Sequence, residues 1–191
     1  MGRIVTFSVT ILGSSGSYAA PDNPCTGYLL RSPGATVLLD CGPGAVGPLQ
    51  TEIDLLDLDA IVLTHCHPDH WMELPVLRNV FTYFAVRTGL PVFGTAETKA
   101  LNDAVTISGR AETFDWTTID PSSTIEIGED IHWQCYGADP VDMRMPVGRK
   151  WITPLPSFEE RRRRGRQRDW PVPLADVRGV LFDLDGVVYR G

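Results

Sequence analysis

The 191 residues, 43% hydrophobic and 21% charged, are enough for one domain of ordinary size, and this composition excludes a chain that is disordered throughout. No apolar run approaches the about 20 residues that span a bilayer, and the N-terminus lacks a signal-peptide core, so we expect a cytoplasmic protein. The net charge is −7, and the four cysteines lack the spacing of a disulfide framework or a zinc ribbon, which indicates reduced thiols.

Strand patterns dominate the beginning of the chain. Ile4 to Leu12 alternates apolar and polar residues and predicts a buried first strand. Two apolar runs, Tyr28–Leu30 and Thr36–Asp40, flank the turn sequence Ser32-Pro33-Gly34 and predict a pair of strands joined by a hairpin turn. A short helix over Leu49–Leu56 is expected to follow.

The middle of the chain alternates between strand and helix signals. Ala60 to Thr64 is a nearly uninterrupted apolar run, as in a strand covered on both faces. Apolar residues then recur at helical spacing from Leu74 to Thr88. A strand at Pro91–Gly94, a helix capped by Thr95 and strand-like alternation over Ser123–Cys135 complete the pattern. This alternation predicts an α/β fold.

One loop concentrates the reactive side chains. The segment Thr64-His65-Cys66-His67-Pro68-Asp69-His70 places three imidazoles and a carboxylate within six residues after a buried strand. Imidazole and carboxylate are ligands of zinc and similar ions, so we favour a metal site over a surface loop that happens to be rich in histidine. In an extended loop His65 and His67 point toward one position, while Asp69 and His70 can turn toward a second. A pair of metal ions is therefore possible, and such pairs hydrolyse phosphodiesters, esters or amides.

Two neighbouring residues receive supporting roles. Asp40 ends an adjacent predicted strand and is our candidate for the outer carboxylate that orients the imidazoles. Cys66 alternates with the two histidines, so it is expected to point away from the metal as a small buried residue.

These residues resemble the metallo-β-lactamase superfamily, whose hallmark is a His-x-His-x-Asp-His motif after a strand. The stretches Leu12–Ser17 and Leu38–Gly44 are similar to ribonuclease Z-like and phosphodiesterase-like members, so the resemblance covers about residues 4–135. It implies an αββα sandwich with one or two zinc ions, His65 and His67 on one and Asp69 and His70 on the other. It also implies hydrolysis of a phosphodiester or other ester through a metal-bound hydroxide that Asp69 helps to position.

The chain departs from this family downstream. Family members add a third histidine, a bridging aspartate and a last histidine, whereas this chain has four histidines in all. The fourth, His132, lies within a predicted strand and is either a hydrogen-bonded strand residue or a replacement ligand. Ala138-Asp139-Pro140 stands where an Asp-His-Pro segment is expected. The alternative to an active hydrolase is therefore a truncated, catalytically inactive metal-binding remnant.

The sequence changes character after about residue 140. Residues 1–140 carry 6 basic and 17 acidic side chains, whereas residues 141–191 carry 11 and 7. We expect residues 141–176 to be irregular, with disorder over about 155–173 around the basic run Arg161–Arg168. That run is expected to be solvated, and binding of nucleic-acid phosphates is the weaker alternative.

The last segment, residues 177–191, is expected to be strand-like. Within it, Val180–Tyr189 resembles the first motif of haloacid dehalogenase-like phosphatases, which implies a nucleophile at Asp183, an acid/base at Asp185 and magnesium. The alternative is a strand followed by an Asp-Gly turn. A hydrolase start, a basic middle and the first motif of another enzyme suggest the hypothesis of a truncated or frame-shifted product.

Overall fold

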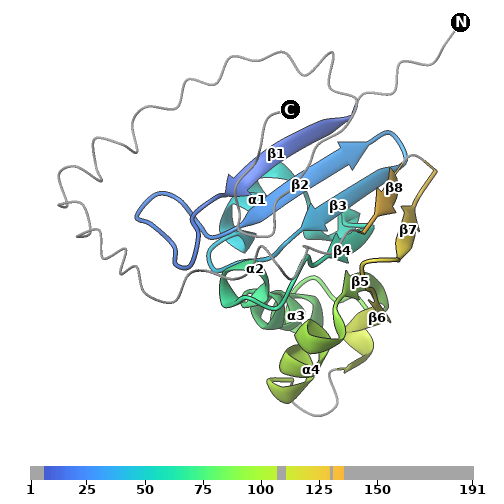
Figure 1. The fold of residues 1–191 in the computed structure, drawn as a ribbon. Coiled ribbons are helices and arrows are strands. Elements are labelled where there is room, and N and C mark those ends of the chain that lie inside the picture. The colour runs from blue at the N-terminus through green and yellow to red at the C-terminus, as the bar shows by residue number, and fades with distance from the viewer. Residues whose placement is uncertain (1–6, 107–110, 130, 136–191) are drawn as a thin grey trace, which may run out of the picture.

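The computed structural model describes residues 7–106, 111–129 and 131–135. Its centre is a six-stranded sheet in the order β1-β2-β3-β4-β5-β6 (Figure 1). The strands are β1 (Ser8–Gly13), β2 (Gly27–Ser32), β3 (Ala35–Leu39), β4 (Ala60–Val62), β5 (Leu90–Gly94) and β6 (Phe114–Thr118). A second sheet pairs β7 (Thr124–Ile127) with β8 (Ile131–Gln134).

The helices follow the same chain order. They are α1 (Val46–Glu52), α2 (Pro68–Trp71), α3 (Leu74–Tyr83) and α4 (Ala96–Ala104), with 3-10 turns η1 (Leu55–Asp57) and η2 (Ala111–Thr113). The longest helix among the described residues has 10 residues. It is too short to cross a bilayer.

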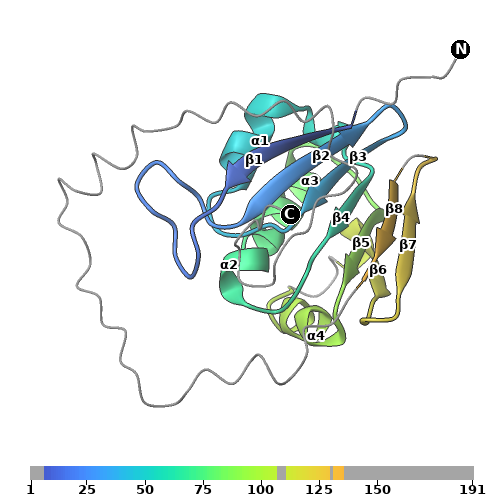
Figure 2. The ribbon, with the colours of Figure 1, turned by 45° about the horizontal axis from the view of Figure 1, so that its top comes forward.

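The central sheet separates two apolar cores. Helices α1 and α3 pack on one face, where Leu49, Leu77 and Phe81 are fully buried against the strands. The β7–β8 hairpin covers the other face with Ile125 and Ile127 (Figure 2). The described residues thus form helix, sheet and sheet layers, which confirms the predicted α/β class and accounts for part of an αββα sandwich.

The short strand β4 lies between the two cores. Ala60 and Val62 contribute to the core under the hairpin, and Ile61 contributes to the core under the helices. This confirms the prediction of a strand covered on both faces. β3, β4, β5 and β6 run parallel, so their carboxyl ends lie at one edge of the sheet, and the histidine loop begins there.

The first strand differs from its prediction. β1 pairs only with β2 and forms an edge of the sheet. Phe7 is 45% exposed and Ile11 is 58% exposed, whereas Leu12 is buried. The apolar alternation was therefore a misleading indicator of burial, because an edge strand leaves part of its surface to solvent.

Two helices have other bounds than predicted. Helix α1 begins at Val46 rather than Leu49, because Pro48 fits the first turn of a helix, where its missing N–H is not needed. Helix α3 ends at Tyr83 instead of Thr88, and Phe84 leaves the helical conformation with φ −121° and ψ −62°. Phe84 consequently stands 83% exposed, although it continues the apolar spacing.

The remaining predictions divide into three groups. The β2–β3 hairpin, strand β5 and the Thr95 cap are confirmed, and Thr95 Oγ1 accepts a hydrogen bond from Thr98 N at 3.2 Å. The strand-like alternation over Ser123–Cys135 is confirmed as two strands, β7 and β8, whereas β6 was not predicted. The expectations for 138–140, 141–176 and 177–191 lie outside the described residues.

Candidate metal centre

The histidine loop starts as an extension of β4 and then turns into a helix. His67 is still extended, with φ −67° and ψ 138°, and Pro68 begins α2, a position at which proline needs no amide donor. The change from extended to helical backbone lets Asp69 and His70 leave the line of the first two histidines. The turn predicted from the sequence is thus a proline-initiated helical turn.

The three imidazoles of the motif lie against one another. The ring centroid of His65 is 4.5 Å from that of His67 and 4.1 Å from that of His70. His65 Nε2 lies 2.9 Å from His67 Nδ1, and His70 Nε2 lies 3.7 Å from Asp69 Oδ2. The four predicted ligands therefore form two contacting pairs, His65 with His67 through a hydrogen bond and Asp69 with His70 through an ion pair.

Asp40 fixes one imidazole directly. Its carboxylate is buried, and its Oδ2 lies 2.7 Å from Nδ1 of the buried His70. A carboxylate accepts only, so Nδ1 of His70 donates to Asp40. Asp40 thus orients the His70 imidazole, the role expected of an outer carboxylate at the predicted metal site.

Asp40 also reaches a second imidazole through a hydroxyl. Thr64 N donates to Asp40 Oδ1 at 2.9 Å, and Thr64 Oγ1 lies 2.9 Å from Asp40 Oδ2. Because the hydroxyl donates to the carboxylate, its oxygen accepts from His65 Nδ1 at 3.0 Å. His65 Nε2 is then unprotonated, as a ligand nitrogen must be.

The loop after β3 holds the helical turn in place. Cys41 N donates to His70 O at 2.6 Å, and Glu73 N donates to Cys41 O at 3.0 Å. Gly42 lies so close to Asp69 that a Cβ there would be 1.9 Å from the Asp69 carbonyl oxygen. The backbone around the motif is therefore fixed by close packing with the 40–42 segment.

Asp69 is held from a distant loop. Ser17 N donates to Asp69 Oδ2 at 2.6 Å, across 52 positions of sequence. Burial raises the pKa of the Asp69 carboxyl, but the hydrogen bond from Ser17 and the histidines beside it bring the net pKa below its usual value. Asp69 is thus stabilised as a carboxylate.

His65 is stabilised in its neutral form. Burial, aided by the neighbouring His70, lowers the pKa of His65 to about 4. A neutral imidazole is the form that binds metal ions, so the site requires no proton release from this ring at neutral pH.

The side chains of the motif, imidazole and carboxylate, are of the types that bind zinc. Two ligands about 2.0–2.1 Å from one tetrahedral zinc lie about 3.4 Å apart, which is longer than the 2.9 Å hydrogen bond between His65 and His67 and shorter than the 3.7 Å between Asp69 and His70. Within residues 7–106, 111–129 and 131–135, however, no three His, Cys, Asp or Glu side chains are grouped so that they could hold an ion. The described residues therefore provide pairs of ligands and no complete coordination shell.

His132 is separate from the motif in the sequence, and Cys66 is half-buried rather than buried as expected. His132 lies in β8, with its Nδ1 3.6 Å from Glu126 Oε1, so it is a strand residue with a polar neighbour. Cys66 is a half-buried free thiol whose carbonyl accepts from Trp71 Nε1 at 3.0 Å. Neither residue adds a third donor to the pairs above.

Sequence patterns did not reveal Thr64 and Ser17 as parts of the site. Thr64 directly precedes the motif, and a hydroxyl beside a ligand is a signal that could have been used. Ser17 acts through its backbone amide, which any residue except proline possesses, so its side chain carried no signal.

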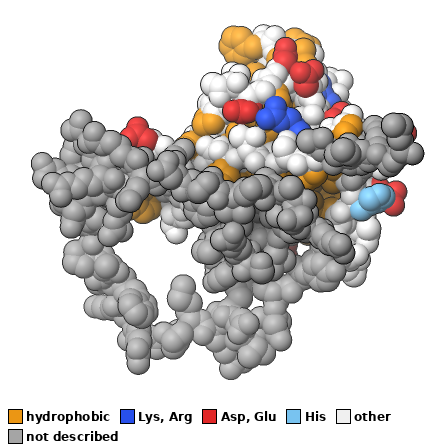
Figure 3. All heavy atoms as spheres, turned by 90° about the horizontal axis from the view of Figure 1, so that it is seen from above, with side chains coloured by type: hydrophobic (Ala, Val, Ile, Leu, Met, Phe, Trp, Pro, Cys, Tyr) orange, Lys and Arg blue, Asp and Glu red, His pale blue; other side chains and the backbone are white. Residues whose placement is uncertain are grey.

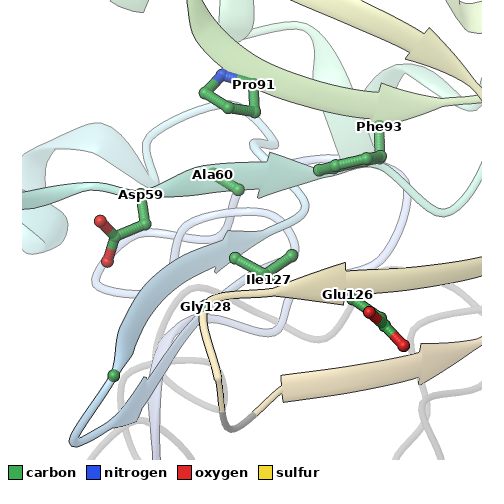
Figure 4. Close-up of a pocket in the computed structure, with 8 residues that line it drawn as sticks. Asp59, Ala60, Pro91, Phe93, Glu126, Ile127 and Gly128 are labelled. Atoms are coloured by element: carbon green, nitrogen blue, oxygen red, sulfur yellow. The ribbon is translucent and has the colours of Figure 1, made fainter.

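A cavity elsewhere in the fold is not this site. It measures about 220 Å³ and is lined by Gly34, Asp59, Ala60, Pro91, Phe93, Glu126, Ile127 and Gly128 (Figure 4). Ala60 begins β4, whereas the histidines follow the end of β4. The cavity and the histidine cluster therefore lie at opposite ends of the same strand.

Comparison with known proteins agrees with the geometry. Residues 20–87 match the metallo-beta-lactamase superfamily. An uncharacterized protein of Mycobacterium leprae is 44% identical over 77 residues, which are 40% of this chain and 27% of that protein. A ribonuclease Z of Methanopyrus kandleri is 29% identical over 138 residues, or 70% of this chain and 48% of the enzyme. The chain thus spans at most about half the length of these relatives.

A solved structure shows the same fold. The metallo-beta-lactamase fold protein YhfI from Bacillus subtilis superposes with a TM-score of 0.55 at 23% identity, over 63% of this chain and 48% of that protein. At this identity the likeness concerns the fold alone. Residues 20–87 of this chain are therefore similar to a segment of the metallo-β-lactamase superfamily.

Proposed function

We propose that the chain acts as a zinc-dependent hydrolase of a phosphodiester or another ester. The observation that carries the proposal is the paired arrangement of His65 with His67 and of Asp69 with His70, with the outer nitrogens of His65 and His70 held by Thr64 and Asp40. A ribonuclease Z among the relatives supports a phosphodiester as the substrate class.

The residues of the chain have distinct roles in this proposal. His65 and His67 would hold one ion, and Asp69 and His70 would hold the other. Bound zinc acts as a Lewis acid and makes water a stronger nucleophile at neutral pH. Asp69, kept ionised by Ser17, would accept a hydrogen bond from the attacking water and orient it.

The alternative is a metal-binding protein without catalysis. It is favoured by the absence of a third grouped donor within the described residues, because a single pair of ligands per ion binds weakly and holds the ion in no fixed geometry. Nucleic-acid binding has less support. On the face that Figure 3 shows, the Lys and Arg side chains of the described part form no broad basic patch and lie beside acidic ones.

Metal analysis and turnover on one protein preparation test the proposal. Elemental analysis gives the zinc content, and bis(p-nitrophenyl) phosphate reports hydrolysis. We expect zinc and turnover in the native chain, loss of turnover and of the ion held by His65 and His67 in His67→Ala, and no change in His132→Ala, which removes the one histidine outside the motif. Zinc without turnover would establish the inactive alternative, and a chain that binds no zinc would refute both.

A further inference from the structure

The loop between β1 and β2 is built around a strained residue. Ser17 has φ +65°, an uncommon value for a residue with a side chain. Tyr18 N donates to Gly16 O at 2.8 Å, and this i→i+2 bond makes a γ-turn centred on Ser17. A turn of this kind persists only where surrounding contacts hold it.

Two sets of contacts hold the turn. Within the β1–β2 loop, Asn23 accepts two hydrogen bonds. Ser14 N donates to Asn23 Oδ1 at 3.2 Å, and Ser15 Oγ donates to Asn23 O at 3.0 Å. On the other side, Ser17 N donates to Asp69 Oδ2 at 2.6 Å. This is a short, charge-assisted hydrogen bond, and bonds of this class are stronger than those between neutral groups.

From this arrangement we infer that Ser17 is a positioning residue of the metal site, acting through its backbone amide. The amide holds the Asp69 carboxylate beside His70, with Asp69 Oδ2 3.7 Å from His70 Nε2. A carboxylate has about four lone-pair sites, so acceptance from Ser17 leaves room for an ion. The inference rests on the proposed metal site. It adds to that site a positioning contact from a segment outside the histidine motif.

The Ser17 side chain has no part in this role, which gives the test its control. Ser17→Gly keeps the amide and favours a positive φ, whereas Ser17→Pro removes the N–H and cannot reach a positive φ. Ala19→Pro places a proline two residues further on, at an exposed residue without a positive φ. Its amide donates none of the hydrogen bonds found among the described residues.

Zinc affinity, measured by competition with a chromophoric chelator, is the readout. Outer contacts of metal ligands are worth about 10–100-fold in affinity, so we expect Ser17→Pro to weaken the zinc site by that factor. Ser17→Gly and Ala19→Pro should keep the native affinity. If folded Ser17→Pro binds zinc as the native chain does, or if Ser17→Gly loses as much affinity, the inference is wrong while the proposed function stands.

A second measurement covers the case in which Ser17→Pro does not fold. In the native chain, the Ser17 amide should exchange slowly with solvent, and its NMR resonance should shift on zinc addition. Fast exchange, or no shift at saturating zinc, overturns the inference. A native chain that binds no zinc at all overturns the proposed function, and the inference with it.

Discussion

Nδ1 of His70 lies 2.7 Å from the carboxylate of Asp40, and both side chains are buried. The same carboxylate accepts from the amide and hydroxyl of Thr64, whose oxygen faces His65. One carboxylate therefore orients two imidazoles that belong to different pairs of proposed ligands.

We predict that Asp40→Asn weakens zinc binding at both pairs by about 10–100-fold. Asparagine tolerates the φ of +57° found at this position, so the substitution changes the acceptor and not the backbone. Chelator competition measures the affinity. Asp57→Asn, which removes an equal charge at an exposed residue, should leave the affinity unchanged, and equal losses in the two variants would contradict the prediction.

Thr64→Val should affect one pair only. The variant loses the hydroxyl between Asp40 and His65 and leaves the contact between Asp40 and His70 intact. We expect about a tenfold loss of affinity for one zinc, at the lower end of what outer contacts contribute. Thr64→Ser keeps the hydroxyl and should bind both ions normally. A biphasic titration of Thr64→Val distinguishes this outcome from a loss at both sites.

Gly42→Ala should destabilise the fold around the motif. The added Cβ would lie 1.9 Å from the Asp69 carbonyl oxygen, and backbone atoms cannot move aside as a flexible side chain can. We expect a loss of about 1–3 kcal/mol in the free energy of unfolding, measured with urea. Gly47→Ala in α1 has no atom within 4 Å of its added Cβ and should stabilise by about 0.5–1 kcal/mol. If Gly42→Ala left the free energy of unfolding unchanged, the contact between Gly42 and Asp69 would be looser than described.

Two phenylalanines near the end of α3 should differ in their contribution to stability. Phe81 is fully buried in the core under the helices, so Phe81→Ala should cost about 3–5 kcal/mol. Phe84 is 83% exposed, and Phe84→Ala should change the free energy of unfolding by less than about 0.5 kcal/mol. Similar losses in the two variants would mean that α3 continues past Tyr83.

The parts of the fold that could be predicted are those whose burial is encoded locally. The run from Ala60 to Thr64 is apolar at nearly every position, and only a strand between two cores explains such a run. β6 was missed because only Phe114 and Trp116 turn toward the core, and two apolar residues in five make a weak signal. Phe84 was misplaced because periodicity does not reveal where a helix ends.

In the site, too, the features encoded by neighbouring residues could be predicted, and those formed by distant residues could not. Its four proposed ligands could be identified because they lie within six residues of one another. The amide of Ser17 reaches Asp69 from 52 positions away, and the hydroxyl of Thr64 acts between two other side chains. Such contacts depend on how the sheet brings distant segments together, which no spacing in the sequence expresses.

The closeness of the four donors in sequence has a thermodynamic consequence. Side chains only a few residues apart remain near one another when the chain unfolds, so the unfolded chain would retain some affinity for zinc. A ligand that also binds the unfolded state stabilises the native state by less than its native affinity suggests. Asp40, by contrast, meets His70 only after folding, because 30 residues separate them. The rise in melting temperature on zinc addition would therefore report the contribution of Asp40 and Ser17 more than that of the histidines themselves.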